Sequence, residues 1–113
     1  MKKLILSIIT LFLFSALGLA QYQDTLRYDN GQIQEIRTYN NSSGELNGKS
    51  IQYFKDGTLA AVVNYKDGLK NGFWHIWHPN GELAYKLHYK NEERIGTWRG
   101  YDKKSDLFFV KKY

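Results

Sequence analysis

Hydrophobic and polar residues alternate with a period of two along much of this chain. Two stretches sort their side chains most clearly onto opposite faces: Leu59, Ala61, Val63 and Tyr65 against Ala60, Val62 and Asn64, and Leu83, Tyr85, Leu87 and Tyr89 against Ala84, Lys86 and His88. Because successive side chains of a β-strand point to opposite faces, this alternation predicts half-buried strands. Nothing after residue 20 shows a helical period, so the pattern predicts an all-β fold.

The alternation returns with a fixed period of 24 residues. The positions that recur are Gly48, Gly72 and Gly96; Tyr53, Trp77 and Tyr101; Leu59, Leu83 and Leu107; and Tyr65, Tyr89 and Tyr113. The first unit is displaced by two further residues, which fall in the polar run 40–43. A constant period of this length is typical of a repeat architecture rather than of a fold with one central active site.

Turn signals separate the strands within each repeat. Asn30-Gly31, Asp56-Gly57 and Asn80-Gly81 lie between apolar runs, which favours β-hairpins. The fixed φ of Pro79 suits the first central position of a type I turn, so we expect three-residue loops in which the glycine is left-handed. The glycines expected to shape turns are Gly31, Gly57, Gly68, Gly72, Gly81 and Gly96.

These elements predict an elongated, single-layer antiparallel meander of stacked β-hairpin repeats of about 24 residues. The expected strands are 33–39, 49–54, 59–65, 73–78, 83–89, 97–102 and 107–113, preceded by a polar N-terminal cap over 21–27 with one or two strand-like residues. About eight strands at about 4.8 Å spacing would form a sheet some 35 to 40 Å long.

Residues 1–20 have the layout of a signal peptide. A short basic start is followed by the almost wholly apolar run 4–17 and by Gly18-Leu19-Ala20, which places small residues before a cleavage site. We therefore predict a signal peptide over 1–20, a repeat domain over 21–113, and a periplasmic, envelope-associated or secreted mature protein. The alternative is an uncleaved anchor, for which the apolar run is at the short limit.

The composition limits the kinds of reactive site and ligand that the chain can have. The chain has no cysteine, which excludes disulfides, thiolate metal sites and cysteine nucleophiles. Loss of Lys2 and Lys3 with the signal peptide lowers the formal net charge from +5 to +3. Such a modest, scattered excess is compatible with anionic phospholipid or acidic glycans as ligands, but equally with an ordinary soluble surface, and it does not indicate nucleic acid.

The repeat resembles a known family. The residues that carry the resemblance are Tyr65-Lys-Asp-Gly68, Gly72-Phe-Trp-His-Ile-Trp77, Asn80-Gly81-Glu-Leu83 and Tyr89, which look like the bacterial variant of the MORN repeat. About three full copies and one partial copy cover nearly all of residues 21–113. The resemblance implies stacked hairpins, with a role in protein scaffolding or phospholipid contact, and relatives of the YwqK type carry an antitoxin label. The chain departs from the pattern at Ser50, where other copies have tryptophan, and at Glu92 and Ser105, where glycine is expected.

No arrangement in the sequence predicts catalysis, a metal site or a cofactor. His75 and His78 are three apart on an expected strand, so they would point to opposite faces and could not share an ion. The serines and threonines lie in turns or at repeat positions without an accompanying base. We therefore expect a protein that is not an enzyme.

Aromatic residues are the candidate binding groups. A single-layer sheet cannot bury both of its faces, so some rings should remain open to a partner, although each ring could equally serve packing within the sheet. The candidate partner-binding residues are Trp74, Trp77, Trp98, Tyr53 and Tyr101. The leading hypothesis is an exported, non-enzymatic repeat module for protein or cell-envelope interaction. The alternatives are an antitoxin or immunity protein and a binder of anionic membrane surfaces.

Overall fold

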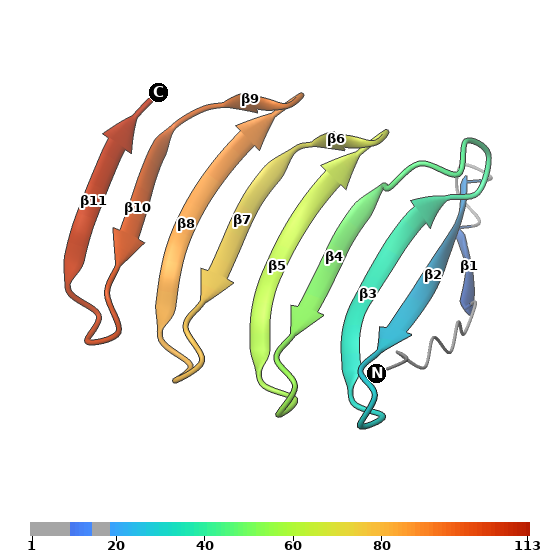
Figure 1. Ribbon diagram of the computed structural model, residues 1–113. Helices are drawn as coiled ribbons and strands as arrows, with labels where there is room; N and C mark the ends of the chain where they lie inside the picture. Colours follow the sequence, from blue (N-terminus) through green and yellow to red (C-terminus); the bar gives the residue numbers. More distant parts are fainter. Residues whose placement is uncertain (1–9, 15–18) are drawn as a thin grey trace.

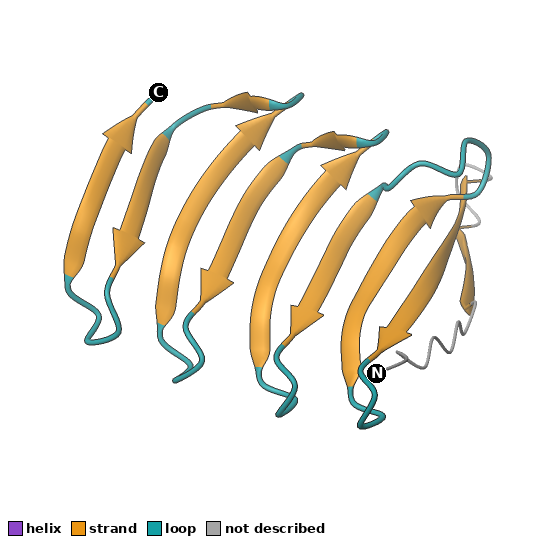
Figure 2. Ribbon diagram, in the orientation of Figure 1, coloured by secondary structure: helices purple, strands orange, loops and turns teal. Residues whose placement is uncertain are grey.

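The computed structural model describes residues 10–14 and 19–113, which form one antiparallel sheet (Figures 1 and 2). The strands run along the sheet in the order β1-β2-β3-β4-β5-β7-β8-β10-β11, and the short strands β6 and β9 pair with β5 and β8. Their bounds are β1 Thr10–Phe14, β2 Leu19–Arg27, β3 Ile33–Asn40, β4 Gly48–Tyr53, β5 Leu59–Lys66, β6 Leu69–Lys70, β7 Gly72–Trp77, β8 Leu83–Lys90, β9 Glu93–Arg94, β10 Thr97–Tyr101 and β11 Leu107–Lys112.

The predicted fold class is confirmed. Each neighbour in the sheet is joined by an antiparallel ladder, and consecutive strands are neighbours, as in a meander. The sheet is open and forms a single layer, with a longest dimension of 42 Å (Figure 1). In the described part of the chain, no helix has the length and apolar character needed to cross a bilayer.

The hairpin loops contain three residues. In the second hairpin, the Phe54 amide donates to Thr58 O at 2.8 Å and the Gly57 amide donates to Phe54 O at 2.9 Å. Gly57 has a φ of 90°, a left-handed conformation that costs glycine little. The last hairpin has the same hydrogen bonds around Asp102, but Ser105 takes the left-handed position with a φ of 70°.

Each hairpin also carries a β-bulge, which changes the expected distribution of side chains. Ile76 pairs with Tyr85, whereas the next residue, Trp77, pairs with Leu83, so Ala84 is the extra residue. The alternation expected over 83–89 is therefore wrong at its start: Ala84 lies on the same face as Tyr85, and Leu83 lies on the opposite face. The equivalent extra residues in the other hairpins are Gln34, Ala60 and Phe108.

Backbone contacts also join successive repeats. After β5, the left-handed pair Asp67 and Gly68 turns the chain into β6. The amide of Asp67 donates to Asn47 Oδ1 at 3.1 Å and the amide of Gly68 donates to Leu46 O at 2.8 Å. The next repeat makes the same pair of contacts from residues 91 and 92 to residues 71 and 70. Each turn is thus tied to the repeat before it.

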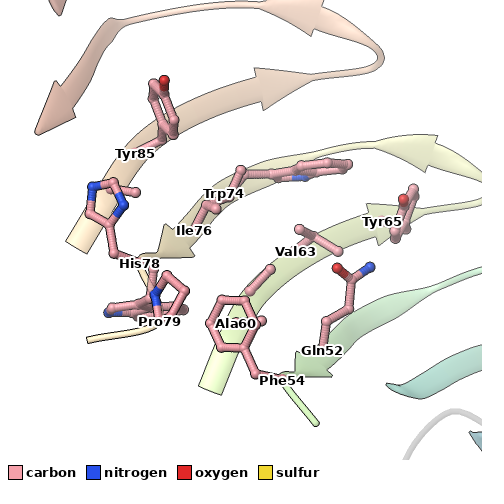
Figure 3. Close-up of a pocket in the computed structure, with 13 residues that line it drawn as sticks. Gln52, Phe54, Ala60, Val63, Tyr65, Trp74, Ile76, His78, Pro79 and Tyr85 are labelled. Carbon is pink, nitrogen blue, oxygen red and sulfur yellow. The ribbon is translucent and has the colours of Figure 1, made fainter. Parts of the chain in front are cut away.

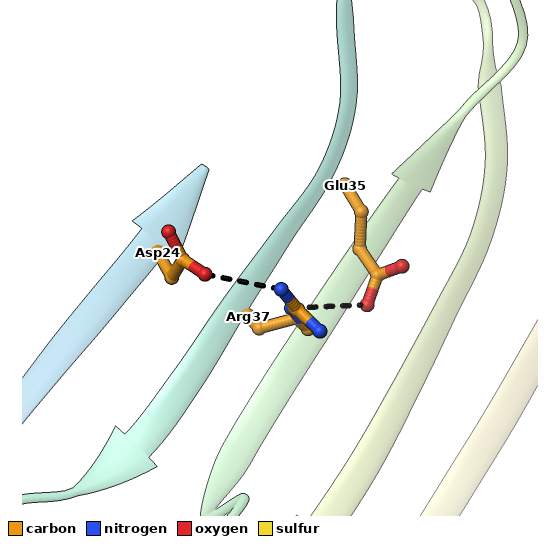
Figure 4. A network of polar contacts seen from close by, with 3 residues as sticks. All are labelled: Asp24, Glu35 and Arg37. Atoms are coloured by element: carbon orange, nitrogen blue, oxygen red, sulfur yellow. Dashed lines mark hydrogen bonds and ion pairs between the residues drawn. The ribbon is translucent and has the colours of Figure 1, made fainter. Parts of the chain in front are cut away.

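The N-terminal unit differs from the expected cap. Instead of one or two strand-like residues, β2 is a nine-residue strand whose residues 21–27 pair with β3. Arg37 lies 3.0 Å from Asp24 and 3.7 Å from Glu35, so charges occupy this part of the sheet (Figure 4). Most of the predicted signal peptide lies outside the described residues; of it, the backbone of 10–14 pairs with 19–23.

Candidate functional site

An apolar groove crosses one face of the sheet from β4 to β11. We call this the groove face. Two adjoining hollows of about 450 and 360 Å³ make up the groove, and Ile76 and Tyr85 line both of them. Figure 3 shows the first hollow, which is lined by side chains from β4, β5, β7 and β8. The second is lined by Ile76, Tyr85, Leu87, Trp98, Phe108 and Phe109.

The floor of the groove is built by small residues at the bulges. Ala61 and Ala84 are buried, and Ala60 lies beside them. In the last repeat the strand β10 contributes a glycine beside the bulge: a Cβ on Gly100 would lie only 2.9 Å from Tyr85 Cε1 and 3.1 Å from Phe108 Cζ. The Tyr85 and Phe108 rings, whose centroids are 6.1 Å apart, therefore sit over a glycine. Both rings remain exposed, Phe108 by 60%.

A ladder of aromatic rings borders the groove at the end of the strands near β6 and β9. Neighbouring centroids are 4.9 to 5.5 Å apart along the series Tyr65, Trp74, Tyr89, Trp98 and Tyr113. The indole of Trp74 donates to Asn64 O and that of Trp98 to His88 O, each at 3.0 Å. Lys70 and Arg94 lie over the rings. These contacts hold successive repeats together.

The opposite side, which we call the basic face, has a different character. His75, Lys86 and Arg99 lie directly opposite one another on β7, β8 and β10. Phe73 stacks on His88 with a centroid distance of 4.1 Å and is 46% exposed. Burial, and then the charge of Lys86, lower the pKa of His75 below its ordinary value.

The five candidate aromatic residues divide between the two faces. Trp74 and Trp98 belong to the ladder beside the groove, and Trp98 is only 8% exposed. Tyr53, Trp77 and Tyr101 occupy equivalent positions on the basic face, where Trp77 stacks on His75 at 5.9 Å. Trp77 also borders the groove at the hairpin end. The structure therefore does not bring the five together into one surface.

Sequence reasoning missed several groove residues. Alternation places Ala60 and Ala84 on the face opposite the groove, whereas both line the groove in the structure. Phe108 also lines the groove but is not among the candidates from the sequence. The available signal was the bulge that accompanies a three-residue hairpin loop, because it adds a residue to the second strand. The turn glycines expected from the sequence, among them Gly57 and Gly81, all have positive φ.

The shifted pKa values do not converge on a reactive centre. Burial raises the pKa of Tyr39 and of Tyr65, two residues of different repeats. Hydrogen bonds from the Thr58 hydroxyl and amide lower the pKa of Asp56, which lies in an exposed turn. Within the described residues, no group of three or more histidines, aspartates or glutamates could hold a metal ion.

Comparison with known proteins agrees with the repeat geometry. A family model described as the MORN repeat variant matches residues 25–41, 46–67 and 74–91, which together make up about half of the chain. Each match contains the second strand of a hairpin, and the two later ones begin within or just before the first strand. A search of curated proteins and a search of solved structures found no significant match. The chain belongs to the MORN repeat variant family.

Proposed function

We propose that this chain is an exported, non-enzymatic repeat module that binds another protein along its groove face. The observation that carries the proposal is the continuous apolar groove from Ala61 to Phe108, which no second layer of the described structure covers. MORN repeats suggest a module for protein or membrane interaction, and the apolar lining favours protein.

The dimensions of the groove suit a protein segment. It crosses six strands, β4 to β11 without the short ones, and at about 4.8 Å per strand this is about 24 Å, or about four turns of helix. Exposed rings such as Tyr85 and Phe108 are the kind of side chain that dominates binding energy at protein interfaces. The charges of Asp24, Glu35 and Arg37 bound the apolar surface at its N-terminal end.

Export remains part of the proposal. Cleavage after Ala20 would remove β1 and leave β2 as the terminal strand, with Gln21 as its first residue. The side chains of Gln21 and Gln23 already bond to Asn47 O and Thr38 Oγ1. Comparing the mass of the exported protein with that of the full chain tests this step: a mature protein starting at Met1 would contradict it.

The binding experiment uses the protein as bait in cell-envelope extract, with two variants of strand β11. Phe108 and Val110 are 60% and 51% exposed but lie on opposite faces of the sheet. We expect Phe108→Ser to lose a partner that Val110→Ser retains, with binding that survives high salt because the contact is apolar. Equal capture by both variants would contradict the groove as the binding surface.

The same experiment separates the other hypotheses. One-to-one capture of a single toxic protein would support the hypothesis that this chain is an antitoxin, as the resemblance to the YwqK type implies. Binding only to anionic vesicles, lost at high salt, would replace the protein proposal with a membrane one.

A further inference from the structure

The basic face carries an ordered apolar row that runs across the strands. Six residues from six neighbouring strands form it, and we call them the apolar row: Tyr53, Leu59, Trp77, Leu83, Tyr101 and Leu107. Each aromatic residue is paired directly with the following leucine. Since successive aromatic residues are two strand spacings apart, the rings recur about every 10 Å.

A second row lies beside the first and carries positive charge. The basic row consists of His75, Lys86 and Arg99, with Val62 and Val110 at its two ends. On β7 and β10 it lies two residues along the strand from the apolar row, a displacement of about 7 Å, and on β5, β8 and β11 the bulge adds one residue to this separation. A ligand lying on the rings of the apolar row would therefore have its edge against the cations.

Lys86 and Arg99, the cations of the basic row, form no ion pair with any described residue. Lys86 and Arg99 are directly opposite each other, an arrangement of like charges that disfavours the sheet. Both side chains are exposed, and among the described residues the ion pairs within 4.0 Å involve only Arg37. Neither row contains an aspartate or a glutamate. A bound anion would relieve this repulsion.

We propose that the basic face binds an acidic polysaccharide, a chain of uronate sugars extended across the strands. Sugar rings present C–H groups that pack on aromatic faces, while uronate carboxylates project from the ring edge. In an extended chain the same edge recurs every two sugars, close to the 10 Å period of the apolar row. The apolar row then holds sugar rings, and Lys86 and Arg99 bind carboxylates.

The arrangement of the sheet favours this ligand over an acidic peptide. A peptide that pairs with a sheet uses the backbone groups of an edge strand, whereas the backbone groups of β7, β8 and β10 are already paired within the sheet. The basic face lies opposite the groove, and of the apolar row only Trp77 also borders the groove. Lys86, Arg99 and Tyr101 therefore stay available to the polysaccharide whether or not the protein partner proposed above is bound.

The test measures affinity for poly-β-1,4-mannuronate by titration calorimetry. The matched ligand control is the same polymer after its carboxylates have been reduced to alcohols, and poly-glutamate represents an acidic polypeptide. We expect binding of the mannuronate polymer and at least about tenfold weaker binding of both controls.

Variants separate a built site from general charge attraction. Lys86→Glu with Arg99→Glu should weaken binding at least about tenfold, and Lys55→Glu with Lys103→Glu, the same charge change in exposed turns, should change it less than about twofold. Trp77→Ala should weaken binding, with circular dichroism to verify folding; if that variant does not fold, Tyr101→Leu replaces it. Absence of binding, equal binding of poly-glutamate, or equal effects of the two charge pairs would overturn the proposal.

Discussion

Ser50 offers a test of packing in which the mutant should be more stable than the native protein. It occupies the position at which later repeats have Trp74 and Trp98, and it is only 2% exposed. Its hydroxyl oxygen is buried and has no hydrogen-bond partner. The tryptophans, in contrast, reach a carbonyl of the neighbouring strand with their indole N–H groups. The serine side chain is too short to make the equivalent bond.

The magnitude follows from two opposing terms. A buried hydroxyl without a partner costs about 1 to 3 kcal/mol, which Ser50→Ala removes. The small void left by one oxygen atom destabilises the mutant by a few tenths of a kcal/mol, at about 24 cal/mol per Å³. We therefore expect a gain of about 1 kcal/mol in the free energy of unfolding, which for a domain of this size raises Tm by about 4 to 8 °C.

Urea unfolding followed by tryptophan fluorescence measures this gain. Ser50→Ala should raise the midpoint without changing the slope, because the surface exposed on unfolding is the same. The control is Ser42→Ala, since Ser42 is exposed and its hydroxyl donates to Asn40 Oδ1 at 2.7 Å. The control should be unchanged or slightly less stable. A lower midpoint for Ser50→Ala would refute the reasoning, because it would show that the buried hydroxyl contributes a favourable contact.

Three further predictions concern single positions. Ser105→Gly should raise stability by about 0.5 kcal/mol, because glycine adopts the φ of 70° without strain while one exposed bond to Glu82 is lost; a lower Tm would contradict this. Gly100→Ala should lower stability by about 1 to 3 kcal/mol, since its Cβ would meet the Tyr85 ring at 2.9 Å, and an unchanged Tm would argue against that packing. Because burial and Lys86 lower the pKa of His75 in the folded state, the unfolded state binds the proton more readily; stability should therefore fall as pH drops below about 6.5. His75→Gln should reduce the difference between urea midpoints at pH 7 and pH 5, and an unchanged difference would exclude His75 as a source of it.

The hairpins could be predicted from sequence because their determinants are local. Asp56-Gly57 and Pro79-Asn80-Gly81 specify the loops through backbone preferences, and the 24-residue period places each copy. The bulge at Ala84 shows the limit of alternation. One extra residue moves Leu83 to the other face, although the sequence still reads as an unbroken period of two.

The residues that share the groove face or the basic face could not be predicted from the sequence, because the register between strands determines which of them are neighbours. Lys86 and Arg99 are 13 residues apart in the sequence, and only the pairing of β8 with β10 shows that they are neighbours. Likewise, the 24-residue period groups Tyr53, Trp77 and Tyr101, but it does not show which face they share. The strand β2 could not be predicted from its side chains, because they are mostly polar and its pairing with β3 depends on backbone hydrogen bonds.

Site-specific photocrosslinking tests the groove most directly. A photoreactive benzoylphenylalanine would replace Phe108 in one protein and Val110 in a second, so that the two probes lie on the same strand but on opposite faces. After irradiation in envelope extract, the account predicts one discrete crosslinked protein from position 108 and none from position 110. The same crosslinked protein from both positions, or only from position 110, would contradict binding along the groove face.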